Sequence, residues 1–118
     1  MDIYIINAFV GKELLGNPAA ICPVESFPND SVMQGIAAQN NLPETAFIQH
    51  LAREHYHIRW FSPKKEVKLC GHATLAASEV IFNHLSPELE SITFASLGGE
   101  LTVEKNGDQM TLKGQIFV

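Results

Sequence analysis

The chain has 118 residues, of which 46% are hydrophobic and 18% charged, and its formal net charge is −5 at pH 7. This composition is typical of one globular domain with one core, and it excludes an intrinsically disordered chain. The acidic balance argues against general nucleic-acid binding, and the apolar runs are too short to span a membrane. We therefore expect a single domain over residues 1–118, located in the cytoplasm because the N-terminus lacks the basic start of a signal peptide.

The first half of the chain predicts four strands. Residues 2–10 are β-branched or aromatic at both alternating positions, which favours a strand covered on both faces. A loop over 11–18 leads to a short strand at 19–24. Two further strands are expected over 44–50 and 54–61, where β-branched and aromatic residues return.

An amphipathic outer helix is expected between the second and third of these strands. The segment Asn29-Asp30-Ser31 precedes an apolar stripe, and Ser31 followed by Gln34 fits a capping box. Asn40 and Asn41 end the helix. The apolar stripe consists of Val32, Met33, Ile36 and Ala37.

The segment LCGHATLAA, residues 69–77, marks the start of a second helix that is apolar on most sides. Many of its apolar positions recur at helical spacing, while Leu75 and Phe82 lie on its other faces. Such a helix is usually buried on most sides, so we expect a sheet wrapped around it. The positions at helical spacing are Ala73, Ala76, Ala77, Val80, Ile81 and His84.

The last third of the chain predicts a β-meander. Strands are expected over 91–96, 100–105 and 108–113, with turns at Gly98-Gly99 and Asn106-Gly107. An Asn-Gly pair is a strong hairpin signal because a type I′ turn needs positive φ at both central positions. Together the elements indicate an α+β fold, in which a curved, mainly antiparallel sheet closes around the central apolar helix and the amphipathic helix lies outside.

Glu44 is the first candidate for chemistry. It begins a strand and shares a face with Ala46 and Ile48. A carboxylate among apolar neighbours has a raised pKa, which suits it to proton transfer. The alternative is a glutamate at the end of a strand whose side chain points into water.

Gly71 and His72 are the second candidates. The first amides of a helix have no partner within the helix, and its dipole makes that end positive, so a substrate carboxylate fits there. Gly71 allows a close approach to the backbone, and a neutral His72 can exchange one hydrogen bond with a substrate. The alternative is an ordinary strand-to-helix turn with a capping or packed histidine.

The cysteines and the remaining histidines predict no further site. Cys22 and Cys70 are expected as reduced, packed thiols, although the start of a helix can lower the pKa of a thiol such as Cys70. His55 and His57 share a strand face without further ligands at a familiar spacing, so no metal is expected. Five of the eight Lys and Arg residues fall between 53 and 68. That local positive region either attracts small anions or forms a solvated strand face.

Three segments carry a family resemblance when they are taken together. They are Gly16-Asn17-Pro18-Ala19-Ala20, Asn41-Leu42-Pro43-Glu44-Thr45-Ala46-Phe47, and Phe61-Ser62-Pro63 through Glu66-Val67-Lys68-Leu69-Cys70-Gly71-His72-Ala73-Thr74. In this order and spacing they closely resemble the phenazine-biosynthesis F-type (PhzF-like) isomerase family, which is related in fold to diaminopimelate epimerase. The resemblance covers nearly the whole chain, and Pro43 departs from the serine that is more common in the family.

The resemblance implies two similar lobes, each a curved sheet around a central helix, with the active site between them. It implies that Glu44 is the catalytic glutamate, that Gly71 and His72 contact the substrate, and that Asn17 also binds it. Family chemistry needs neither a cofactor nor a metal. The glutamate removes a proton from one carbon of a small carboxylated substrate and returns it to another, so that a double bond migrates.

Family members are about twice as long as this chain, which matches only their N-terminal lobe. We therefore expect a homodimer, or a separate chain that supplies the second lobe. Two functions stand as hypotheses. The first is an isomerase of the PhzF type, and the alternative is a catalytically incomplete half-protein that acts as a binding or protein-interaction module.

Overall fold

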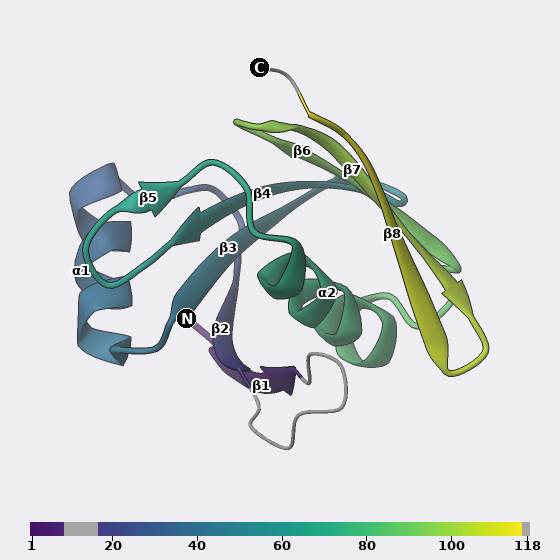
Figure 1. The fold of residues 1–118 in the computed structure, drawn as a ribbon, viewed down its shortest axis with the longest axis horizontal. Coiled ribbons are helices and arrows are strands. Elements are labelled where there is room, and N and C mark those ends of the chain that lie inside the picture. The colour runs from purple at the N-terminus through teal and green to yellow at the C-terminus, as the bar shows by residue number, and fades with distance from the viewer. Residues whose placement is uncertain (9–16, 117–118) are drawn as a thin grey trace.

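A curved sheet and two helices make up the fold, which was obtained as a computed structural model that describes residues 1–8 and 17–116 (Figure 1). The strands are β1 (Tyr4–Ala8), β2 (Asn17–Val24), β3 (Glu44–Ala52), β4 (His55–Phe61), β5 (Glu66–Val67), β6 (Ser91–Ser96), β7 (Gly99–Asn106) and β8 (Gln109–Ile116). The helices are α1 (Asp30–Asn40) and α2 (Gly71–Val80), and α2 continues into a π-helical turn, η1 (Ile81–Leu85). Neither helix is long and apolar enough to cross a membrane among the residues described.

The strands form one sheet in the order β1-β2-β3-β4-β6-β7-β8, with β5 paired to β4. Within the described ranges five strand pairs are antiparallel, whereas β2 with β3 and β4 with β6 are parallel. The sheet curls around α2, and α1 lies against the opposite face (Figure 1). The predicted α+β fold with a curved sheet around a central helix is confirmed.

Strand alternation divides the core into two clusters. Along β3, Ala46 and Ile48 face α2, whereas Phe47 faces α1. This division follows from the two-residue period of a strand, which sends successive side chains to opposite faces. The cluster around α2 is the larger one and encloses the helix on nearly every side. Its members from the helix are Ala73, Ala76, Ala77 and Val80, all of them buried.

The central helix is shorter than the sequence pattern predicts. Regular α-helix ends at Val80, and the chain widens into η1 before Ser86, whose amide donates to the carbonyl of Ile81 over 2.7 Å. His84 therefore leaves the predicted apolar stripe. It is exposed and stacks on Tyr4 with 5.2 Å between the ring centroids.

The predicted capping box of α1 is wrong. Asn29 takes the extended N-cap backbone, so the helix starts at Asp30 and Ser31 lies within it. Gln34 instead donates from Nε2 to the carbonyl of Ser62 over 2.9 Å, which ties the helix to the turn between β4 and β5. Val32, expected on the apolar stripe, is 47% exposed.

The strand limits and turns also differ from the prediction. β1 is an edge strand covered on one face only, so Ile5 is 66% exposed. β2 begins at Asn17 instead of 19, and the rest of the predicted loop, residues 11–16, lies outside the described residues. The last hairpin turns at Gly107-Asp108, because Gly107 takes the positive φ of 63° and Asn106 still pairs with Gln109.

Candidate active site

The turn between α1 and β3 places Glu44 at the first position of β3. Asn41 ends α1 in the left-handed conformation, with φ 53°, and its amide donates to the carbonyl of Ala37 over 3.1 Å. Asn40 Nδ2 then donates to the hydroxyl of buried Thr45 over 3.2 Å. These bonds hold the chain on both sides of Glu44. Alternation along β3 directs Glu44 to the face that α2 covers, while Thr45 lies on the other face.

The Glu44 carboxylate is partly removed from water. Its Oε2 is buried and has no hydrogen-bond partner within the described part of the chain. Burial raises the pKa of Glu44 above its ordinary value, and nearby His72 opposes that rise. A carboxyl group with this environment is more basic than one in water, which favours proton abstraction.

The N-terminal end of α2 is the second component. Cys70 occupies the N-cap with extended backbone, φ −146° and ψ 98°, and its side chain makes no capping hydrogen bond. The first amide bonded inside the helix is that of Thr74, which reaches the carbonyl of Cys70 over 3.1 Å. The preceding amides, those of Gly71, His72 and Ala73, therefore have no carbonyl partner within the helix, and those of His72 and Ala73 lie beside the Cys70 thiol.

His72 lies in the first turn of α2, beside this end. Its Nε2 is buried and has no hydrogen-bond partner within the residues that are described. Nε2 of a histidine is either a hydrogen-bond donor or an acceptor. A buried Nε2 without a hydrogen bond is therefore unfavourable, and a bound ligand can supply that bond. His72 and Glu44 thus present two unsatisfied polar atoms in one region.

The Cys70 thiol belongs to the same region. Burial is the largest cause that raises its pKa, and the Glu44 carboxylate raises it further. The amides of Ala73 and His72 act in the opposite direction without reversing the shift. The predicted packed thiol is therefore favoured over a reactive thiolate. Cys22 is also free and buried, and burial raises its pKa to about 11.

The structure describes the surroundings of Gly71 but not the side chain of Asn17. A Cβ on Gly71 would lie 3.3 Å from Cδ2 of Leu112, so the close approach at this glycine involves the side chain of a residue in β8. Asn17 is the first residue of β2 and pairs with Ala8, but its side chain lies outside the described residues. Substrate contact by Gly71, His72 or Asn17 stays a prediction.

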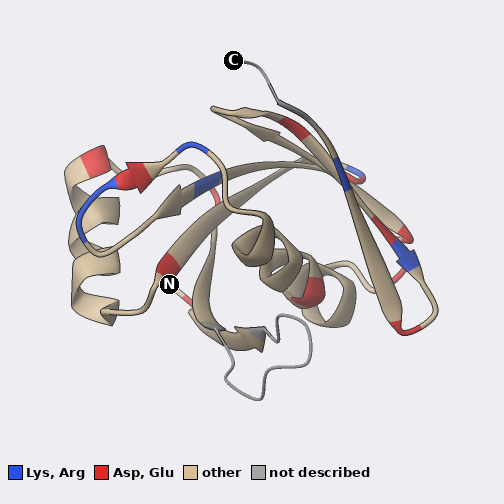
Figure 2. Cartoon of the chain, viewed as in Figure 1, with Lys and Arg blue, Asp and Glu red and all other residues tan. Residues whose placement is uncertain are grey.

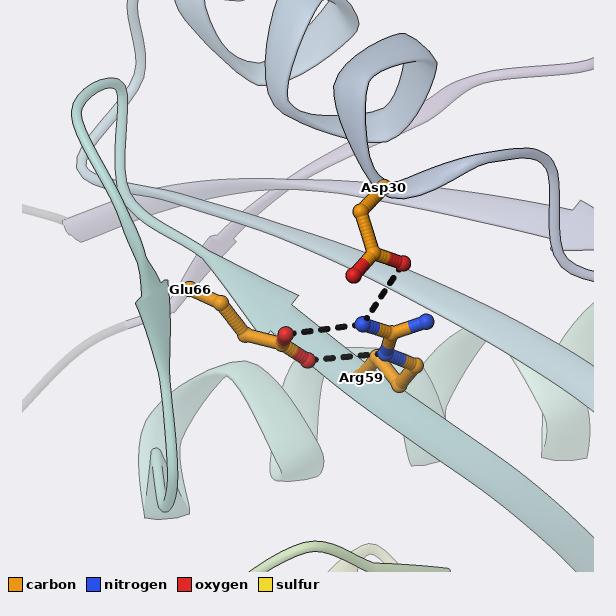
Figure 3. Close-up of polar contacts among 3 residues, drawn as sticks. All are labelled: Asp30, Arg59 and Glu66. Atoms are coloured by element: carbon orange, nitrogen blue, oxygen red, sulfur yellow. Dashed lines mark hydrogen bonds and ion pairs between the residues drawn. The ribbon is translucent and has the colours of Figure 1, made fainter.

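The positive region between 53 and 68 is partly internal, which the sequence pattern did not reveal. Arg59 on β4 binds Glu66 of β5 through two hydrogen bonds of 2.7 and 2.8 Å (Figure 3). It also forms an ion pair of 3.1 Å with Asp30 of α1. Its guanidinium lies over the rings of Phe27 and Phe61, with 5.7 and 5.5 Å to the centroids. Arg59 therefore fastens α1 and β5 to the sheet and is not free to bind a small anion.

Of the two histidines that share a face of β4, one packs and the other is exposed. The ring of His57 packs edge-on against the ring of Phe27, with 4.8 Å between the centroids. Burial is the largest cause that lowers the pKa of His57, and the positive charge of Arg59 lowers it further. His55 is exposed beside Glu54. No cluster of three metal-binding side chains occurs among the described residues. In Figure 2 the basic residues lie on strands, in the turn between β3 and β4 and in the segments before and after β5, and α2 carries none.

Comparison with known proteins identifies the family. The family model described as phenazine biosynthesis-like protein, PhzC-PhzF, matches residues 6–117. The chain belongs to the PhzC-PhzF family. A Pseudomonas aeruginosa protein named as an uncharacterized isomerase is 42% identical over 113 residues, which are 95% of this chain and 43% of that protein.

Solved structures agree with this assignment. A PhzF-family phenazine biosynthesis protein of Enterococcus faecalis superposes with a TM-score of 0.83 at 44% identity, covering 92% of this chain and 41% of that one. A predicted epimerase of Pseudomonas aeruginosa shares the fold, with a TM-score of 0.71 at 21% identity, and the match covers 92% of this chain and 40% of that one. The chain therefore spans about two fifths of the length of these PhzF and epimerase-fold proteins.

Proposed function

We propose that this chain carries one half of the active site of a cofactor-independent PhzF-type isomerase. The observation that carries the proposal concerns two buried atoms near the start of α2, Glu44 Oε2 and His72 Nε2, which have no hydrogen-bond partner among residues 1–8 and 17–116. Membership of a family whose relatives include a named isomerase supports the same reaction class.

In the proposed reaction, the carboxylate of a small substrate binds at the amides of the first turn of α2. The positive end of the helix dipole stabilises this anion. His72 adds one hydrogen bond through Nε2, which fixes the orientation of the substrate. The role of the helix is to hold the substrate with its acidic C–H directed to Glu44.

Glu44 then acts as the base and afterwards as the acid. It takes a proton from one carbon, and the electron pair of the broken C–H bond moves into the conjugated system next to the substrate carboxylate. The protonated Glu44 returns the proton to another carbon, so a double bond changes position and no electrons are gained or lost. The raised pKa of Glu44 serves both steps, since it brings the acid and base forms closer in energy near neutral pH.

A second lobe completes the proposed site. The chain spans 43% of its Pseudomonas aeruginosa relative and 41% of the Enterococcus faecalis structure, so the remainder of those proteins is not matched by residues 1–118. We infer that a second copy of this chain, or a segment equivalent to the second lobe of the relatives, covers Glu44 and His72. Light scattering tests the homodimer: a mass near twice the 13.0 kDa of one chain supports it, and a monomer at all concentrations contradicts it.

Proton exchange tests the reaction. Small carboxylates with an acidic C–H are incubated with the protein in deuterium oxide, and deuterium in the recovered compound is followed by NMR. The proposal predicts exchange with the natural protein and its loss in Glu44→Gln. The matched control is Glu79→Gln, because Glu79 is an exposed glutamate on α2.

A further inference from the structure

A buried hydrogen-bond relay ends at the peptide group that precedes Gly71. Trp60 Nε1 on β4 donates to Oγ1 of Thr74 over 3.1 Å, and this hydroxyl donates to the carbonyl of Cys70 over 2.8 Å. The exposed fractions of Trp60 and Thr74 are 1% and 0%. The relay therefore runs from the buried centre of the sheet to the start of α2, where Cys70 is half-buried.

The direction of the relay follows from the chemistry of its donors. An indole N–H can only donate, so Thr74 Oγ1 must accept from Trp60. The single hydroxyl proton of Thr74 is then directed to the carbonyl of Cys70. That carbonyl also accepts the amide of Thr74 over 3.1 Å, so two hydrogen bonds from one residue fix its orientation.

Fixing the Cys70 carbonyl also fixes the amide of Gly71, since both belong to one planar trans peptide group. In such a group the C=O and N–H bonds point in opposite directions. The carbonyl of Cys70 points into the helix toward Thr74, so the N–H of Gly71 points out of the N-terminal end. Hydrogen bonds in series polarise one another, which strengthens this amide as a donor.

We propose that Trp60 and Thr74 are positioning residues that hold the Gly71 N–H toward the carboxylate of the substrate. This inference rests on the proposed function, because it assumes that an anion binds at the start of α2. Neither residue needs to touch the substrate. Each acts through the Cys70–Gly71 peptide group.

Ser78 provides a matched control within the same helix. Its hydroxyl donates to the carbonyl of Thr74 over 2.8 Å, and Ser78 is fully buried like Thr74. Its bond reaches a carbonyl inside the helix, away from the Cys70–Gly71 peptide group. Ser78→Ala therefore removes a buried hydroxyl without breaking the relay.

The test uses NMR of the 118-residue chain, whose single tryptophan gives one indole N–H signal. In Thr74→Val, hydrogen exchange of the indole accelerates about tenfold and the nitrogen signal of Gly71 shifts. Trp60→Phe shifts the Gly71 signal as well. Thr74→Ser keeps the hydroxyl and preserves both signals, and Ser78→Ala preserves both.

Titration with acetate then measures the effect on anion binding at the Gly71 and His72 amides. The natural protein and Thr74→Ser respond equally, whereas Thr74→Val and Trp60→Phe bind acetate about three- to tenfold more weakly. If Thr74→Val binds acetate as tightly as the natural protein does, the relay is overturned but the anion site is not. The same holds if Thr74→Ser weakens acetate binding as much as Thr74→Val does. No response in the natural protein contradicts the anion site, and with it the proposed function. If Thr74→Val does not fold, Trp60→Phe and Thr74→Ser decide the matter.

Discussion

Glu44 and His72 stand on different elements, at the start of β3 and in the first turn of α2, and each buries a polar atom without a hydrogen-bond partner in the described part of the chain. The two residues act on each other electrostatically, because His72 opposes the rise in the pKa of Glu44. Buried polar atoms without partners are costly, so these two atoms are the candidates for hydrogen bonds to a substrate.

The proximity of Glu44 and Cys70 can be tested without a substrate. Since the Glu44 carboxylate raises the pKa of the Cys70 thiol, Glu44→Gln should increase the thiolate fraction at pH 8. Iodoacetamide should then alkylate Cys70 faster in Glu44→Gln than in the natural protein, as measured by mass spectrometry of the labelled peptide. Cys22 is buried and serves as the internal control. Equal rates in Glu44→Gln and Glu79→Gln would show that the carboxylate and the thiol are not neighbours.

The pH dependence of stability reports on the burial of Glu44. A carboxyl group whose pKa is raised on folding stabilises the fold below its unfolded pKa, and this contribution disappears as pH rises through the folded pKa. The stabilising contribution of Glu44 therefore begins to fall near the ordinary carboxyl pKa of 4.5 and is lost at higher pH, above the raised pKa of the folded protein. Urea unfolding should show that Glu44→Gln gains stability relative to the natural protein between pH 4 and pH 7. A difference that is constant over this range would place the carboxyl in water.

The sequence pattern predicts the elements that depend on local periodicity. The apolar spacing of residues 73–81 is sufficient to identify the enclosed helix, and the alternation of Glu44 with Ala46 and Ile48 is sufficient to identify the face of the strand. The desolvation expected for Glu44 is present in the structure. The catalytic role of Glu44 stays a prediction.

The sequence pattern does not predict the contacts between distant segments of the chain. Arg59 pairs with Glu66 and Asp30 only because β5 is the strand paired beside β4 and α1 covers the outer face of the sheet, and no spacing rule brings these three residues together. The bond from Trp60 to Thr74 likewise depends on how the sheet curls around α2. The turn at Gly107-Asp108 differs from the predicted position because the pairing of β7 with β8 includes Asn106, which local turn preference does not specify.

Arg59→Lys tests the ion-pair cluster on the outer face. Lysine cannot reproduce the two parallel bonds to Glu66 or the planar contact with Phe27 and Phe61. We expect a loss of about 1 to 2 kcal/mol in the free energy of unfolding, measured in urea. The control is Lys113→Gln, which breaks an exposed pair with Glu104 and should cost less than about 0.5 kcal/mol. Similar losses in both variants would mean that Arg59 acts only as a surface charge.

Two glycines give opposite predictions for substitution by alanine. A Cβ on Gly98 would overlap the carbonyl oxygen of Lys68, in the segment that leads into α2, so Gly98→Ala should destabilise the fold by about 1 to 3 kcal/mol. Gly35 lies inside α1 with open space around the added Cβ. Gly35→Ala should stabilise the fold by about 0.5 to 1 kcal/mol. Thermal unfolding measures both, and a stable Gly98→Ala protein would argue against the close packing of these two segments.

Deuterium incorporation into a small carboxylate, in deuterium oxide, by the natural protein, Glu44→Gln and Glu79→Gln tests whether Glu44 carries the proton. We expect incorporation by the natural protein and by Glu79→Gln, loss of at least about a hundredfold in Glu44→Gln, and a rate that falls as acidification protonates Glu44. Incorporation at the same rate by Glu44→Gln would contradict this role of Glu44.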